Sequence, residues 1–124
     1  MLFRSQGAGS GTRTLLDFHL RREGISPLTI AGYPSTLPTH LAVAAAVAEG
    51  RADAGLGLLA AARAYGLDFV PLAHERYDLI LQAVDRERAP LRDLLELASS
   101  DEFRAVVAEL GGYDTTQSGR EVLL

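Results

Sequence analysis

SQGAGSGTR, residues 5–13, is the stretch around which the rest of this 124-residue chain is organised. It follows a short apolar strand expected at Leu2 and Phe3, and it leads directly into an amphipathic helix expected over 14–22. Its three glycines stand at alternate positions, where they let the backbone turn sharply and approach a ligand closely, because no Cβ stands in the way. The stretch therefore predicts a strand–loop–helix junction of the kind found in α/β domains.

The start of this helix has the physical features of an anion-binding site. With Ser10 or Thr12 as the N-cap, the first backbone N–H groups and the positive end of the helix dipole point outward. Helix N-termini of this kind bind oxyanions. Arg13 adds a permanent charge with a forked set of donors. We therefore expect ligand contacts from Ser10, Gly11, Thr12 and Arg13, although a glycine-rich turn before a helix also occurs where no ligand binds.

Three better-known motifs are excluded by single residues. The P-loop requires a Lys before its Ser or Thr, and all twelve cationic residues of this chain are arginine. The dinucleotide-binding fingerprint requires its third glycine where Thr12 stands. A nucleophile elbow has glycines two residues on either side of its serine, whereas Ser10 has them directly adjacent. What remains is an oxyanion or phosphate site at a strand–loop–helix junction.

A second loop-to-helix junction has similar chemistry. A loop over 33–40, which contains two prolines, leads into an alanine-rich helix expected over 41–49. Thr39 is the expected N-cap, and Gly50 follows the last turn. Beside the cap, His40 is the histidine best placed to contact a ligand. Thr39 and His40 therefore join the candidate ligand-binding residues.

We expect no catalytic site, metal or resident cofactor. His19 lies on an apolar helical face, and His74 lies among charged residues. A Ser10, His40 and Asp53 triad can be written down, but no nucleophile geometry supports it. The chain has no cysteine, and no two histidines share a helix at metal-ligand spacing. Asp53 is instead expected to orient the start of a strand.

Short strands alternate with helices along the chain, which predicts an α/β fold with a mixed, mostly parallel sheet flanked by helices. Further strands are expected over 28–30, 54–58, 69–72 and 77–83. Further helices are expected over 60–65, from Pro90 onward, and after a break and new cap at 99–101. We expect one domain over 1–112 and a C-terminal tail over 113–124.

Charge and hydropathy limit the partners and the cellular location that we expect for the chain. The formal net charge is −4, so no basic surface indicates direct nucleic-acid binding. No signal-peptide pattern and no apolar run of membrane-spanning length is present. We therefore expect a cytoplasmic protein without a membrane partner.

Three segments that occur in the right order resemble one family. GSGTR at 9–13, THLAVA at 39–44 and GRADAGLG at 50–57 resemble the type 2 periplasmic-binding-protein-like domain. DFVPL at 68–72 and ERYDL at 75–79 resemble the same branch of that family. This branch is related to molybdate- and tungstate-binding proteins, and it is found fused to helix-turn-helix regulators or to MoeA-type molybdopterin-biosynthesis proteins.

The resemblance implies a fold of two α/β lobes around a cleft. In that fold, backbone amides and hydroxyls at helix starts hold an oxyanion such as molybdate, tungstate, sulfate or phosphate. Ligand contacts are then implied at Ser10, Gly11, Thr12, Thr39 and His40. The implied function is ligand binding or sensing, linked to transcription regulation or to molybdenum cofactor biosynthesis. The alternative is a structural domain that binds no ligand and dimerises through its exposed lobe face.

The chain departs from the family's pattern at two points. Molybdate binders have a tyrosine shortly after the ADAG-like segment, where this chain has Leu58 or Leu59, so one hydroxyl donor is missing. The chain also begins where the family's second lobe begins, which makes it a three-layer second lobe, either as a fragment or as a lone lobe. We then expect weak binding by one lobe, unless a homodimer or the missing first lobe completes the cleft.

Overall fold

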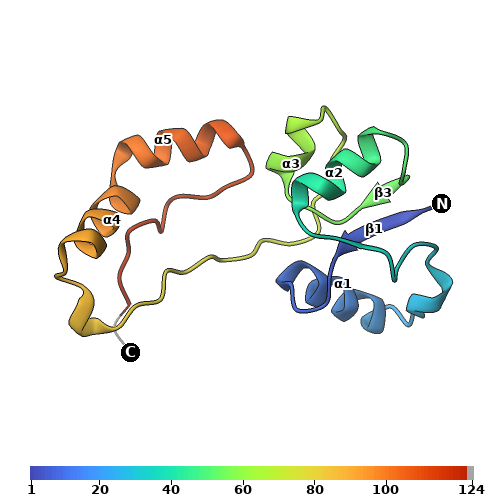
Figure 1. Ribbon diagram of the computed structural model, residues 1–124, viewed down its shortest axis with the longest axis horizontal. Coiled ribbons are helices and arrows are strands. Elements are labelled where there is room, and N and C mark those ends of the chain that lie inside the picture. The colour runs from blue at the N-terminus through green and yellow to red at the C-terminus, as the bar shows by residue number, and fades with distance from the viewer. Residues whose placement is uncertain (123–124) are drawn as a thin grey trace. The chain divides into compact units, whose positions relative to one another are not determined.

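The strand that precedes the glycine-rich stretch, β1 (Phe3–Gln6), is the central strand of a parallel sheet (Figure 1). The computed structural model describes residues 1–122 and divides the chain into two units, Met1–Phe69 and Val70–Leu124. The domain boundary expected after residue 112 stays a prediction, and the last two residues of the expected tail lie outside the described residues.

The first unit has three strands with helices on both faces of the sheet. Its elements in chain order are β1, α1 (Gly11–Arg22), η1 (Pro27–Thr29), β2 (Thr36–Leu37), α2 (His40–Ala48), β3 (Ala54–Gly55) and α3 (Leu59–Ala64). The strand order is β2-β1-β3, and both outer strands run parallel to β1. Helix α1 covers one face, and α2 with α3 covers the other (Figure 1). The three layers confirm the expected α/β fold.

Small side chains form the core of this unit, which lets the helices lie close to the sheet. The buried apolar side chains are Leu20, Val43, Ala44, Ala46, Ala52, Ala61 and Ala62. At Gly55 in β3, a Cβ would overlap the Cγ1 of Val43 and would lie 3.2 Å from the Arg4 carbonyl oxygen. The missing side chain at Gly55 therefore allows α2 to approach closely, and it fixes the distance between α2 and β3.

The second unit is helical. Its elements are η2 (Ala83–Asp85), α4 (Ala89–Ser99) and α5 (Asp101–Leu110), and the two α-helices contact each other. Pro90 stands in the first turn of α4, and Ser100 caps α5 by accepting a hydrogen bond of 3.1 Å from the Phe103 N–H. Among residues 70–122 no side chain is fully buried.

Several expected boundaries are wrong by a few residues. The first strand extends to Gln6, and the first two α-helices begin at Gly11 and His40, close behind their capping residues. The strand expected over 54–58 is only Ala54–Gly55. Its remaining residues form the link to α3, and pairing with β1 is confined to Ala54 opposite Phe3 and Gly55 opposite Arg4.

Three expected strands are not observed in the described residues. Residues 28–30 fall mostly within η1, since Ser26 accepts a hydrogen bond from the Leu28 N–H and Pro27 starts a helical turn. Residues 69–72 and 77–83 lie in or next to a long segment, 65–82, that contains neither helix nor strand. Their alternation of side chains suits a strand, but no neighbouring strand in the described chain pairs with them.

Candidate functional site

The loop between β1 and α1 has the expected turn and cap. Gly9 has a φ of 92°, a backbone conformation that glycine adopts without steric cost. Ser10 is the N-cap, and its Oγ accepts a hydrogen bond from the Arg13 N–H at 3.1 Å. The same hydroxyl donates to the Gly7 carbonyl oxygen at 3.0 Å. Ser10 is therefore the cap, and the alternative, Thr12, is a buried residue inside the helix.

Two backbone N–H groups at the start of α1 are left without a hydrogen bond in the described chain. The N–H groups of Gly11 and Thr12 donate to no acceptor within residues 1–122. Gly11 is exposed, and its lack of a side chain leaves its amide accessible. The first turn of α1 therefore has the unsatisfied donors and the dipole end that an anion requires.

The loop before α2 has the same arrangement. Thr39 has extended backbone angles, and its Oγ accepts a hydrogen bond of 3.0 Å from the Ala42 N–H. This confirms Thr39 as the N-cap of α2. The Leu41 N–H donates to no acceptor in the described part of the chain. His40, in the first turn, lies against Gly57, since a Cβ on that glycine would be 3.8 Å from the histidine Nδ1.

The two helix starts share one edge of the sheet. Because β1, β2 and β3 are parallel, their carboxyl ends meet at the same edge, and each candidate loop follows one of these ends. At this edge Gly7 lies against Thr36, whose Oγ1 would be 3.7 Å from a Cβ on that glycine. The neighbouring strands β1 and β3 are followed by helices on opposite faces (Figure 1). Such a topological switch point is where α/β sheets bind their ligands.

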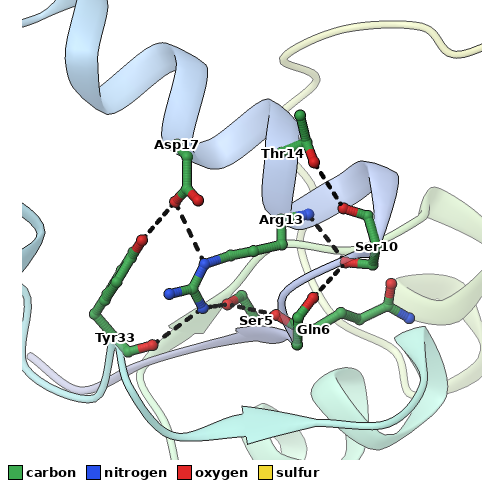
Figure 2. Close-up of polar contacts among 8 residues, drawn as sticks. Ser5, Gln6, Ser10, Arg13, Thr14, Asp17 and Tyr33 are labelled. Carbon is green, nitrogen blue, oxygen red and sulfur yellow. Dashed lines mark hydrogen bonds and ion pairs between the residues drawn. The ribbon is translucent and has the colours of Figure 1, made fainter.

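Figure 2 shows the Arg13 side chain directed toward Asp17, Tyr33 and Ser5. Its Nη1 donates to the Ser5 Oγ at 2.9 Å and to the Tyr33 carbonyl oxygen at 3.1 Å. Its Nε pairs with the Asp17 carboxylate at 3.3 Å, and its guanidinium lies 3.6 Å from the centroid of the Tyr33 ring. The side chain is only 10% exposed. Sequence reasoning missed Tyr33, and only the i, i+4 spacing to Asp17 gave a signal.

Asp53 lies at the opposite edge of the sheet from the candidate loops. Its carboxylate accepts a hydrogen bond from the Leu2 backbone N–H, and its own N–H donates to the Leu2 carbonyl oxygen at 2.7 Å. Its expected role in orienting a strand start is confirmed. The structure therefore does not bring Ser10, His40 and Asp53 together as a triad.

Other titratable groups have structural partners. His19 makes an edge-on contact with Phe18, whose ring centroid is 5.6 Å away. The Thr116 N–H, 2.9 Å from a carboxylate oxygen of Asp114, lowers the pKa of that carboxyl, and His74 contributes weakly in the same direction. The Glu121 carboxylate hydrogen-bonds to Arg86 and raises the pKa of that guanidinium.

Two kinds of feature are absent from residues 1–122. No group of three or more His, Asp or Glu side chains is arranged to hold a metal ion. In the same residues, no helix has the length and apolar character needed to cross a membrane.

Comparison with known proteins gives one family and two relatives. The family model of the PBP (periplasmic binding protein) superfamily domain matches residues 2–99. Uncharacterized protein YvgK of Bacillus subtilis strain 168 is 36% identical over 115 residues, which are 93% of this chain and 37% of that protein. A Clostridium pasteurianum protein, described as uncharacterized and in the 5′ region of a ferredoxin 2Fe-2S gene, is 38% identical over 109 residues. That match covers 87% of this chain and 96% of the relative. No solved structure matches.

Proposed function

The chain belongs to the PBP superfamily, and from this premise we propose that its first unit forms one wall of a cleft that binds a small oxyanion. The observation that carries the proposal is the position of two capped helix starts, those of α1 and α2, at the carboxyl edge of one parallel sheet. Helix starts combine free N–H groups with positive dipole ends, and both favour an anion.

The available donors support an oxyanion over a cation. They are the N–H groups of Gly11, Thr12 and Leu41, none of which has an acceptor within residues 1–122. The Thr39 hydroxyl oxygen accepts from the Ala42 N–H, which leaves its hydrogen for a ligand. The Ser10 hydroxyl hydrogen is already used by the Gly7 carbonyl. We therefore propose Thr39 as the principal hydroxyl donor to molybdate, tungstate, sulfate or phosphate.

One wall of a cleft binds an anion weakly. An anion on this edge is exposed to water and salt, so its attraction to the helix dipoles is strongly screened. We propose that a second copy of the chain, or a further lobe of a longer polypeptide, completes the cleft and raises the affinity. The YvgK relative is long enough to contain further lobes, since this chain spans only 37% of its length.

The biological setting is part of the same proposal. The segments at 9–13, 39–44 and 50–57 resemble the branch fused to regulators or to molybdopterin-biosynthesis proteins. On that basis the domain senses or delivers an oxyanion in the cytoplasm for transcription regulation or molybdenum cofactor synthesis, without catalysing a reaction itself.

Calorimetric titration of the chain with molybdate, tungstate, sulfate and phosphate tests the proposed function. We expect millimolar affinity for at least one anion and a marked loss of affinity in Thr39→Val, which lacks the hydroxyl. Thr39→Ser keeps both the cap and the donor and should bind like the unaltered chain. Ser100→Ala removes a cap in the second unit and serves as the control. Absence of heat at millimolar concentrations of all four anions overturns the proposal.

A second candidate function, as an interaction domain, is favoured by the second unit. Its described part contains no fully buried side chain, and large apolar residues such as Val84 and Ile80 are 82% and 91% exposed. A surface of this kind is typical of a binding face for another protein. Sedimentation measurements with and without anion separate the two functions, because an interaction domain dimerises independently of the anion.

A further inference from the structure

Four residues from three segments form a polar cluster beside the start of α1 (Figure 2). The Arg13 cluster consists of Ser5 in β1, Arg13 and Asp17 in α1, and Tyr33 in the loop before β2. The Tyr33 hydroxyl donates to the Asp17 carboxylate at 2.6 Å, and that carboxylate pairs with the Arg13 Nε. Arg13 in turn donates to the Tyr33 carbonyl oxygen. Both the backbone and the ring of Tyr33 are therefore held by α1.

Before Tyr33 the loop is fixed to β1 by the Phe3 N–H, which donates to the Ala31 carbonyl oxygen at 2.9 Å, and the Ser35 N–H closes a turn on the Gly32 carbonyl oxygen at 2.9 Å. After Tyr33 the loop is less firmly held. It leads into β2, which is two residues long and pairs with β1 only through Thr36 opposite Ser5 and Leu37 opposite Gln6. A strand pair this short is marginal by itself. Two residues after β2, Thr39 caps α2 and begins the second half of the proposed site.

The charge of Arg13 is already compensated. Its guanidinium pairs with Asp17, stacks on the Tyr33 ring and donates to two oxygens, so a ligand would have to replace these contacts to reach it. Ser5, which accepts one of the hydrogen bonds, is itself 1% exposed. Because these contacts occupy Arg13, the anion is bound by the backbone N–H groups and by the Thr39 hydroxyl.

We propose that Arg13 is a positioning residue, which fixes the start of α2 relative to the start of α1 by holding Tyr33. The inference rests on the proposed oxyanion function, and it replaces the direct contact between Arg13 and the ligand that the sequence suggests. The planar fork of the guanidinium is essential to this role, because a lysine ammonium keeps the charge but cannot bond Ser5, Tyr33 and Asp17 together.

The test compares three variants of the 124-residue chain, with Arg13→Gln as a fourth that removes the charge of Arg13. Tyr33→Phe removes only the hydroxyl that bonds Asp17, and Arg13→Lys keeps the charge but removes the fork. Arg22→Lys is the control, since Arg22 is in the last turn of the same helix and pairs with Glu23 at the surface. Two quantities are measured for each variant. The first is the backbone amide NMR shifts of residues 36–41 without ligand, apart from Pro38, which has no N–H. The second is molybdate affinity by calorimetry at several salt concentrations.

We expect Tyr33→Phe and Arg13→Lys to move the amide resonances of residues 36–41. Both should weaken molybdate binding by about tenfold, the effect of losing one hydrogen bond to a charged group. The salt dependence of binding should stay that of the unaltered chain, since no charge that touches the anion has been removed. Arg22→Lys should change neither quantity. A purely stabilising role would lower the melting temperature but leave the affinity of the folded protein unchanged.

Other results overturn the inference. If Arg13 touches the anion, Arg13→Gln flattens the salt dependence while Tyr33→Phe binds normally. If Tyr33→Phe leaves the amide resonances of 36–41 in place, the positioning role is wrong. If the unaltered chain binds no anion, the proposed function fails, and the amide shifts of Tyr33→Phe still decide the positioning role. If Arg13→Lys does not fold, the results for Tyr33→Phe alone decide whether the positioning role is correct.

Discussion

Gly55 sets the distance between α2 and the sheet. A Cβ at this position would overlap Val43, so Gly55→Ala must push the helix away or strain the strand. We expect it to lower the free energy of unfolding by about 1–3 kcal/mol, the usual cost of overpacking a core. Urea denaturation followed by circular dichroism measures this change.

Gly57→Ala is the matched control for this substitution. Its Cβ would meet its nearest atom, the His40 Nδ1, at 3.8 Å, which is ordinary van der Waals contact. We therefore expect little change in stability from Gly57→Ala. Equal losses from both substitutions would mean that backbone freedom, and not the contact with Val43, explains the glycine at 55.

Single residues differ in how far the sequence predicts their roles. The caps at Ser10 and Thr39 follow from a local pattern, a hydroxyl residue directly before a helix, and both are confirmed. The partners of Arg13 depend on Tyr33, which is twenty residues away in the chain. No local periodicity indicates such a contact, because only the fold brings the loop before β2 onto α1.

At the scale of elements, two neighbouring serines test how α5 begins. The Ser100 Oγ accepts from the Phe103 N–H, whereas the Ser99 hydroxyl bonds only to carbonyl oxygens one turn back in α4. Ser100→Ala should destabilise the helical unit by about 1 kcal/mol, because the Phe103 N–H loses its acceptor. Ser99→Ala should be close to neutral, since alanine favours the helix interior.

Thermal unfolding monitored by the helical circular-dichroism signal compares these two variants. A larger loss for Ser99→Ala than for Ser100→Ala would show that the connection between α4 and α5, and not the cap, stabilises the second helix. The prediction depends only on the second unit, where both helices lie.

Helices are predicted from this sequence better than strands for a physical reason. A helix satisfies its backbone within its own segment, so capping residues and apolar spacing are enough to place α1, α2 and α5. A strand also requires a neighbour. Residues 77–83 have the alternation of a strand, yet the described chain offers them no partner. Residues 77–82 contain neither helix nor strand, and Ala83 begins η2. The expected strand at 28–30 is wrong because Ser26 and Pro27 start a helical turn.

At the scale of the whole molecule, the alternation of elements correctly predicts the α/β class, and the order of three segments correctly predicts the superfamily. The strand order β2-β1-β3 is not contained in any local pattern, since it depends on which side of β1 each helix crosses. For the same reason, the meeting of the α1 and α2 starts at one edge becomes visible only in the folded chain.

The segment 65–82, which contains neither helix nor strand, also determines where a protease first cleaves the chain. Trypsin requires an extended stretch around an accessible basic residue, and this chain has only arginines. Arg76 lies inside the segment with its side chain 80% exposed and pairs with Asp78 of the same segment. Arg63 stands in α3, and Arg86 is bonded to Glu121, which is 35 residues away in the chain. Brief digestion followed by mass spectrometry should therefore show a first cut after Arg76. A first cut within α1 or α2 would contradict this expectation, whereas the expected one would release a fragment that keeps the whole sheet and both capped helix starts.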